Sequence, residues 1–234
     1  MSATADRQPV PRGIESLMVG GRVLPMARWG SPVMHVRTSH VTAFDEELQT
    51  LVRDMFATMR ESRGVGLAAT QVGVGLSLFI YDCPDAEERH QYGAVCNPTL
   101  SLPQGKDRRL DVAPEGCLSL PGAFQALGRP DRAVCTGVDP FGQPVTVIGT
   151  GLLARCLQHE TDHLKGIVFG DRLPDKARRD LYAQHQSVAH HYPNEWPTQA
   201  DPQPTPGHSR LGYTTPVEFE HAHYTALALE GRPR

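Results

Sequence analysis

The feature that most constrains this chain is a pair of histidines four residues apart, His159 and His163, within Gln-His-Glu-Thr-Asp-His-Leu at residues 158–164. In a helix, residues four apart lie on the same face, one turn apart, so both imidazoles can reach one metal ion. Glu160 follows the first histidine, where its carboxylate is placed to act on water at the ion rather than to bind the ion. This motif therefore predicts a helix that carries a metal centre.

The residues around the motif predict that this helix is buried. An apolar stripe occupies the one to two turns before His159, and glycines stand before and after the segment (Leu152, Leu153, Cys156, Leu157; Gly149, Gly151, Gly166). Buried imidazoles need partners, and a metal ion is one good partner.

Two histidines do not complete a catalytic metal site, because zinc and similar ions usually take three protein ligands and keep one position open. The candidates downstream, Asp171, Asp175 and His185, have no convincing spacing. A better candidate is Cys117, in Glu-Gly-Cys-Leu-Ser at residues 115–119. A cysteine beside apolar residues can also be ordinary core, so the spacing alone leaves both readings open.

A third segment, residues 64–73, is rich in glycine and other small residues. Such residues let the backbone approach a ligand closely, and Gln71 adds a side-chain amide that can donate or accept a hydrogen bond. The segment lacks the Gly-Lys-Ser/Thr ending of a nucleotide-binding P-loop.

Taken together and in this order, the three segments resemble the peptide deformylase family, over roughly residues 24–174. The resemblance implies an α+β fold of short, mostly antiparallel strands packed around a central metal-binding helix. It also implies that Cys117, His159 and His163 hold one divalent metal ion. The physiological ion is expected to be Fe²⁺, with Zn²⁺, Ni²⁺ or Co²⁺ as alternatives after purification.

The implied reaction is the removal of the formyl group from the N-terminal formylmethionine of newly synthesised polypeptides. Glu160 is expected to act as general base and then as general acid. The side-chain amide of Gln71 and the backbone N–H of Leu118 are expected to stabilise the negative charge on the formyl oxygen. Val65 and Gly66 are expected to bind the substrate, since a side chain at position 66 would block its approach.

Composition agrees with an enzyme of the cytoplasm. The net charge of -3 gives no reason to expect sequence-specific binding of nucleic acid. The five cysteines are odd in number and scattered, which favours a reducing compartment over a disulfide framework. Neither a secretion signal nor a membrane-spanning stretch is expected. The expected partners are formylmethionyl nascent peptides and, transiently, the ribosome.

The pattern along the chain divides it into four parts. A disordered extension is expected at 1–20, the catalytic domain at 21–174, a C-terminal helix at 175–192, and a proline-rich, mostly disordered tail at 193–234 with a short helix at 217–229. Within the domain, apolar periodicity predicts a helix at 43–62 and strands at 76–81, 133–138 and 145–148, the last two joined by a hairpin turn.

Three side chains in the last motif have open interpretations. Asp162 either orients a metal ligand or faces solvent. Gln158 is expected to be structural. Arg155 either narrows the substrate pocket or extends outward along it, and we favour the second.

Two other functions compete with this prediction. A zinc peptidase that cuts internal peptide bonds is disfavoured by the absence of a downstream third ligand and by the presence of Gln71 and Cys117. A metal-binding relative without catalysis, acting at the ribosome, is disfavoured by the retention of Glu160 and Gln71. Activity on formylated against unformylated peptides would distinguish a deformylase from the zinc peptidase. Metal content measured together with deformylase activity would distinguish it from the binding protein.

Overall fold

The computed structural model describes residues 13–197, in which seven strands form two antiparallel sheets. The five-stranded sheet has the order β1-β2-β3-β6-β7, and the two-stranded sheet pairs β4 with β5. The strands are β1 (Gly66–Ala68), β2 (Leu78–Pro84), β3 (His90–Ser101), β4 (Leu110–Gly116), β5 (Phe124–Pro130), β6 (Arg132–Val138) and β7 (Pro144–Thr150). This arrangement confirms the predicted α+β fold with antiparallel strands.

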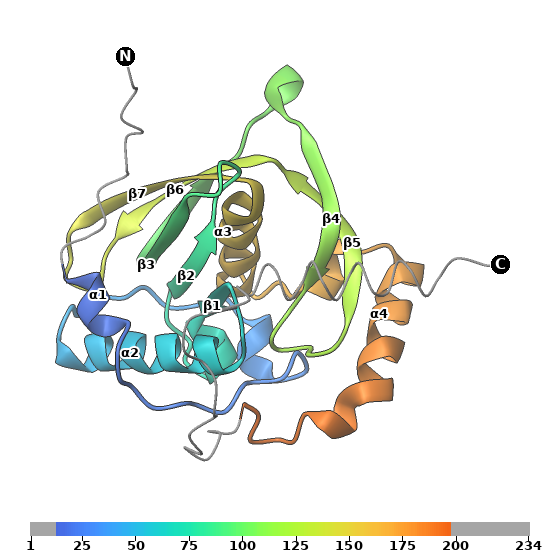
Figure 1. The fold of residues 1–234 in the computed structure, drawn as a ribbon, viewed down its shortest axis with the longest axis horizontal. Coiled ribbons are helices and arrows are strands. Elements are labelled where there is room, and N and C mark those ends of the chain that lie inside the picture. The colour runs from blue at the N-terminus through green and yellow to red at the C-terminus, as the bar shows by residue number, and fades with distance from the viewer. Residues whose placement is uncertain (1–12, 198–234) are drawn as a thin grey trace, which may run out of the picture.

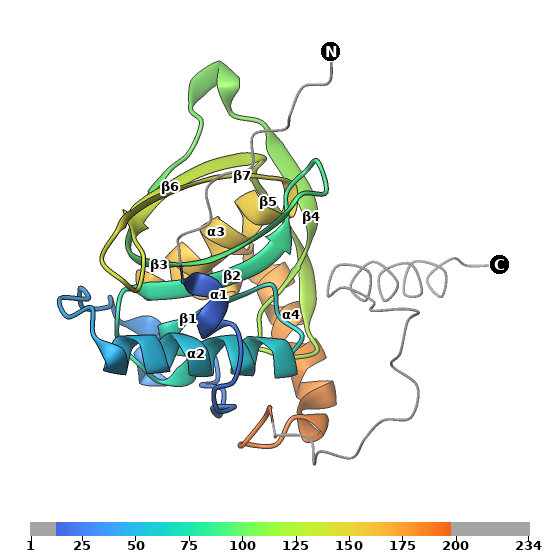
Figure 2. The same ribbon diagram turned by 60° about the vertical axis from the view of Figure 1, so that its left-hand side comes forward.

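Helix α3 (Gly151–Leu164) carries the two histidines and lies between the larger sheet and the β4–β5 hairpin (Figures 1 and 2). Its apolar stripe is buried as predicted, with Leu153 and Leu157 fully covered by residues of β2, β3, β6 and β7. Because both sides of the helix are covered, every residue from Leu153 to Leu164 is buried. The tertiary structure therefore places polar motif residues inside the protein.

Helix α2 (Glu46–Glu61) packs beside this core with Val52, Met55 and Phe56 on its buried face. The sequence predicted a start at residue 43, but Asp45 is the N-cap, since its carboxylate accepts the N–H of Leu48 at 3.1 Å.

The predicted hairpin between the last two strands is present. Asp139 closes its turn by accepting the N–H of Gly142 through its carbonyl, and β6 and β7 pair from Arg132 to Val138. The predicted strand at 76–81 corresponds to β2, which begins two residues later.

The two ends of the described chain differ from the simplest reading of the sequence. A disordered extension was expected over residues 1–20, yet Ile14–Leu17 forms a short helix, α1, with Ile14 and Leu17 buried in the core. At the other end, the tail was expected to be mostly disordered from residue 193, yet Trp196 packs against the core and its carbonyl accepts the N–H of Met26. Residues 1–12 and 198–234 lie outside the described part, and with them the expected helix at 217–229. Helix α4 (Asp175–Val188) falls within the predicted C-terminal helix. In residues 13–197, no helix is both long and apolar enough to cross a membrane.

Candidate metal centre

Three predicted ligands from two distant segments meet at one point. His159 and His163 come from α3, and Cys117 follows the last residue of β4. The Nε2 atoms of the two histidines are 3.1 Å apart, and the Cys117 sulfur is 3.3 Å from Nε2 of His163. All three donor atoms lie within 4.8 Å of one another. No second cluster of this kind occurs in residues 13–197, including around His185, His190 and His191.

The donor set and its surroundings fit a single divalent transition metal ion. One thiolate and two imidazoles are the ligands that zinc, iron, cobalt and nickel accept. Nδ1 of His159 lies 2.8 Å from a carboxylate oxygen of Glu115. A carboxylate accepts hydrogen bonds, so Nδ1 carries the proton, and the lone pair of Nε2 faces the other two donors. Burial lowers the pKa of His163 well below its ordinary value, which favours the neutral, metal-binding form of its ring.

Glu115 is held by arginines. Both carboxylate oxygens accept hydrogen bonds from Arg129, at 2.6 and 2.7 Å, and one accepts a third from Arg155 at 3.0 Å. Burial by itself would raise the pKa of Glu115, but the hydrogen bonds from Arg129 and His159 keep that pKa well below its usual range. In the sequence, Glu115 is the first residue of the Glu-Gly-Cys-Leu-Ser motif, and no role was predicted for it from that pattern.

Asp162 belongs to the same buried set of charges, because it accepts a hydrogen bond from Arg129 at 3.0 Å and is paired with Arg172. Of its two sequence interpretations, the solvent-facing one is therefore wrong. Among the described residues, Asp162 is linked to the ligand His159 only through the Arg129 guanidinium, which also binds Glu115. Gln158 is structural as expected, since its amide donates to backbone carbonyls of Pro130 and Ala154.

The favoured interpretation of Arg155, that its side chain extends outward along the pocket, is wrong. Arg155 is buried, and besides Glu115 it donates to the carbonyls of Leu127 and Asp111, both at 2.9 Å. The β4–β5 hairpin closes over the side chain and offers these acceptors, so a buried arginine is satisfied without reaching solvent. Arg155 thereby ties α3 to the hairpin that presents Cys117.

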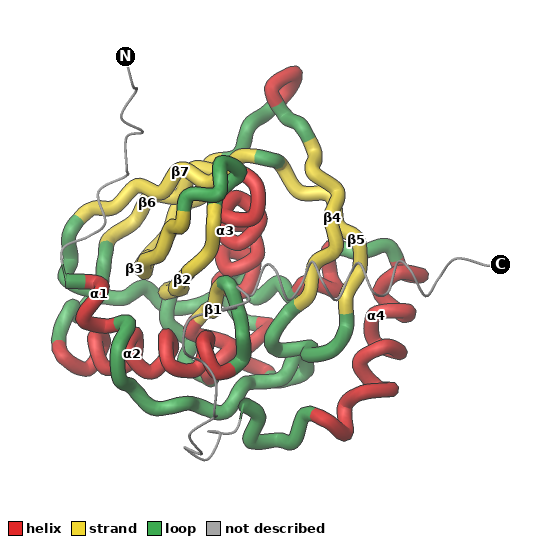
Figure 3. The backbone as a smooth tube through the Cα atoms, viewed as in Figure 1, coloured by secondary structure: helices red, strands yellow, loops and turns green. Residues whose placement is uncertain are grey.

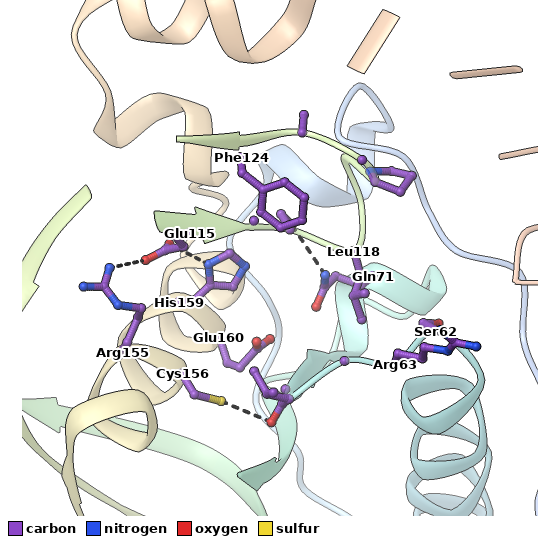
Figure 4. Close-up of a pocket in the computed structure, with 18 of the residues that line it drawn as sticks. Ser62, Arg63, Gln71, Glu115, Leu118, Phe124, Arg155, Cys156, His159 and Glu160 are labelled. Atoms are coloured by element: carbon purple, nitrogen blue, oxygen red, sulfur yellow. Dashed lines mark hydrogen bonds and ion pairs between the residues drawn. The ribbon is translucent and has the colours of Figure 1, made fainter. Parts of the chain in front are cut away.

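A cavity of about 390 Å³ is lined by the ligands Cys117 and His159 and by all the other residues predicted to act in the site (Val65, Gly66, Gln71, Leu118, Glu160). Figure 4 shows Glu160 and Gln71 on the same side of His159. Burial raises the pKa of Glu160 to about 7, and its Oε2 has no hydrogen-bond partner among the described residues. A positive ion nearby would bring that pKa down again.

The position of Gln71 is fixed by its backbone neighbours. Its amide oxygen accepts the N–H of Ala68 at 2.8 Å, which leaves the NH₂ group pointing towards the Cys117 sulfur, 3.7 Å away. The amide can therefore serve only as a donor towards the cavity, as its predicted role requires.

The structure explains why a glycine stands at position 66. A Cβ there would lie 2.5 Å from Glu160 Oε1 and 2.6 Å from the Cys156 sulfur. The missing side chain thus makes room for Glu160 itself, in addition to any approach by a substrate. At the neighbouring Val65, the carbonyl already accepts the N–H of Asp82 and the Cys156 thiol, at 2.9 and 3.5 Å.

Two further groups at the site were not predicted from the sequence. The first is the pair Glu115 and Arg129, because the partner arginine stands alone in an unremarkable segment. The second is the pair of aromatic residues Tyr192 and Trp196, which line the cavity from beyond α4. The only sequence signal for the second pair was that two large aromatic residues occur where proline and polar residues begin to dominate.

Comparison with known proteins gives one consistent result. Residues 23–179 match the family model described as polypeptide deformylase. The chain is 50% identical over 174 residues to peptide deformylase 1 of Streptomyces avermitilis, covering 74% of this chain and 80% of that protein. It is 50% identical over 171 residues to peptide deformylase 2 of Streptomyces coelicolor, covering 73% and 94%.

Solved structures agree. The peptide deformylase of Legionella pneumophila superposes with a TM-score of 0.65 at 34% identity, over 72% of this chain and 96% of that one. The peptide deformylase of Ehrlichia chaffeensis in complex with actinonin gives a TM-score of 0.65 at 32% identity, over 73% and 98%. On these grounds the chain belongs to the polypeptide deformylase family.

Proposed function

We infer that this protein is a metal-dependent hydrolase that removes the formyl group from the N-terminal formylmethionine of newly synthesised polypeptides. The observation that carries this conclusion is the convergence, on one cavity, of a Cys-His-His donor set with a buried carboxylate and a side-chain amide donor. Membership of the deformylase family supports the same substrate.

Cys117, His159 and His163 would hold the ion. When bound there, a divalent ion supplies Lewis acidity, which makes water more acidic and polarises a carbonyl oxygen. Glu115 keeps the proton of His159 on Nδ1, so that Nε2 remains a ligand.

Glu160 carries out the proton transfers. Its carboxylate accepts a proton from the attacking water, whose oxygen bonds to the formyl carbon. As the carbon–nitrogen bond breaks, the same group delivers the proton to the leaving amine. The products are formate and a peptide with a free amino group.

Gln71 and Leu118 complete the site. The Gln71 NH₂ group and the backbone N–H of Leu118 would donate to the formyl oxygen as it becomes negative. A donor positioned in advance for such a charge typically lowers the barrier by about 3–4 kcal/mol. Val65 and Gly66 lie along the same cavity, at the start of β1, which is an end strand of the five-stranded sheet, and the backbone of an extended peptide can pair with the free edge of such a strand.

For the finer assignments we propose Fe²⁺ as the physiological ion, with formylated nascent chains met transiently at the ribosome in the cytoplasm. The mixed thiolate and imidazole donor set is compatible with Fe²⁺ but also with Zn²⁺, Ni²⁺ and Co²⁺. Metal analysis of protein purified without oxygen tests the ion directly.

The deciding experiment compares formyl-Met-Ala with unformylated Met-Ala-containing peptides, using the full chain loaded with a known ion. Release of formate from the first, with no cleavage of internal bonds in the second, is expected. Cleavage of internal bonds would favour the peptidase alternative. A fully metal-loaded protein that turns over neither substrate would favour the binding-protein alternative.

A further inference from the structure

The segment after α4, residues 189–197, turns back and runs beneath the domain towards α2 (Figure 3). We call this segment the C-terminal strap. The side chains of Tyr192 and Trp196 are half-buried, and both line the cavity that contains Glu160 and the ligands His159 and Cys117. The strap is therefore a wall of the site, although it begins 25 residues after the last residue of the motif helix, Leu164.

Arg28 anchors this strap. One of its guanidinium nitrogens donates to the carbonyls of Tyr192 and Pro193, at 2.9 and 2.7 Å. The guanidinium also lies 5.5 Å from the centre of the Trp196 ring, within the range of a cation–π contact. The N–H of Met26 donates to the carbonyl of Trp196 at 2.8 Å.

The segment that anchors the strap also supports two parts of the site. The N–H of Ala27 donates to the carbonyl of Gln71 at 2.8 Å, and the N–H of Trp29 donates to the carbonyl of Ser119 at 2.9 Å. The strap is thus fixed relative to the amide donor and to the loop that follows Cys117.

The aromatic rings of Tyr192 and Trp196 pack against each other. Their centres are 5.3 Å apart and their planes are perpendicular, which is a favourable packing of aromatic residues. A Cβ at Gly122 would lie 2.6 Å from a methyl carbon of Val188 and 3.0 Å from a ring carbon of Tyr192, so the glycine makes room for both side chains.

We propose that Tyr192 and Trp196 form a subsite for an apolar side chain that follows the formylmethionine of the substrate. This inference rests on the proposed function. The formyl group must lie at the ligands and Glu160, and an extended peptide advances about 3.3 Å per residue. The later residues therefore lie further from the ligands along the cavity, whose lining includes the two half-buried aromatic rings. The strap selects substrates by sequence and takes no part in the bond-breaking step.

The test uses three peptides, formyl-Met-Ala-Ser, formyl-Met-Phe-Ser and formyl-Met-Ala-Phe, and the full chain in every case. In the unchanged protein, at least one of the two peptides that contain phenylalanine is expected to have a higher kcat/KM than formyl-Met-Ala-Ser, through a lower KM. In Tyr192→Ala, and separately in Trp196→Ala, that advantage should shrink about 3- to 10-fold, as expected for the loss of one aromatic contact. Tyr192→Phe keeps the ring and should restore the advantage.

The matched control is His191→Ala, at the exposed neighbour of Tyr192, which does not line the cavity. This variant should keep all three rates. A purely structural strap would lower the rates of all three peptides by the same factor and leave their ratios unchanged. That result, or equal kcat/KM for the three peptides in the unchanged protein, would overturn the proposal. Failure of the unchanged protein to release formate from any peptide would instead refute the proposed function.

Discussion

Replacing Glu115 by glutamine tests how the buried charges support the metal centre. The carboxylate accepts three hydrogen bonds from the guanidinium groups of Arg129 and Arg155 and one from His159, and all four residues are buried. Glutamine keeps the shape but removes the charge, leaving two buried cations facing a neutral amide. Breaking a buried ion pair by removing one partner typically costs about 3–5 kcal/mol. Since a domain is stable by about 5–15 kcal/mol, this loss is large.

The same substitution weakens the orientation of His159. Removing a group that orients a metal ligand typically lowers metal affinity about 10- to 100-fold. We therefore expect Glu115→Gln to lower the free energy of unfolding of the metal-free protein by about 3–5 kcal/mol, and to weaken metal binding in a competition titration with a chelator.

Two control variants should lose less stability than Glu115→Gln, because each removes a weaker part of the same interactions. Asp111→Asn removes the other carboxylate partner of Arg155. The side chain of Asp111 is 49% exposed, so solvent screening should keep the loss of stability below about 1 kcal/mol. Arg155→Met leaves Glu115 with its bonds from Arg129 and His159, and an intermediate loss of about 2 kcal/mol is expected. A loss below about 1 kcal/mol for Glu115→Gln, with unchanged metal affinity, would refute the reasoning.

The pH dependence follows from the same interactions. Because the pKa of Glu115 in the folded state is lowered from the ordinary 4.5, its contribution to stability is complete above that value and is lost as the pH falls towards the folded pKa. The metal-free protein should therefore lose stability in acid, below about pH 4.5, more steeply than its Glu115→Gln variant does. Parallel stability curves would count against this account.

Four further changes give simpler outcomes. Glu160→Ala should retain the metal but lose about 10²- to 10⁴-fold in kcat, and metal loss in step with activity would make this residue a ligand. Gly66→Ala places a Cβ 2.5 Å from a Glu160 oxygen, so kcat should fall while the metal content stays constant; unchanged kcat would show that the carboxylate can move aside. Iron-loaded protein should lose activity in air through oxidation of Cys117 and nickel-loaded protein should not, which mass spectrometry and activity together can check. A chain ending at Asn194 lacks Trp196 and should unfold about 2 kcal/mol more easily than one ending at residue 197, whereas equal stability would show that the strap contributes little.

The sequence by itself determined which helix carries two of the three candidate metal ligands. His159 and His163 had to share a face because four residues make about one helical turn, and that relation is local. The hairpin between β6 and β7 was also readable, since its turn residues and flanking strands are adjacent in the chain. The fold class and Cys117 followed from a resemblance between three short motifs and a known family.

The tertiary structure alone decided what surrounds those residues. Glu115 and Arg129 meet His159 and Asp162 because β4 and β5 pair across α3, and no local periodicity records a contact between segments that distant. Arg155 is satisfied inside the protein for the same reason: its acceptors are backbone carbonyls of another element, and any residue type supplies these. Tyr192 and Trp196 reach the cavity only because the chain turns back after α4 and Arg28 holds it there. Ligands at helical spacing are a short-range property of the chain, whereas ion-pair partners, burial and cavity walls depend on how the elements pack.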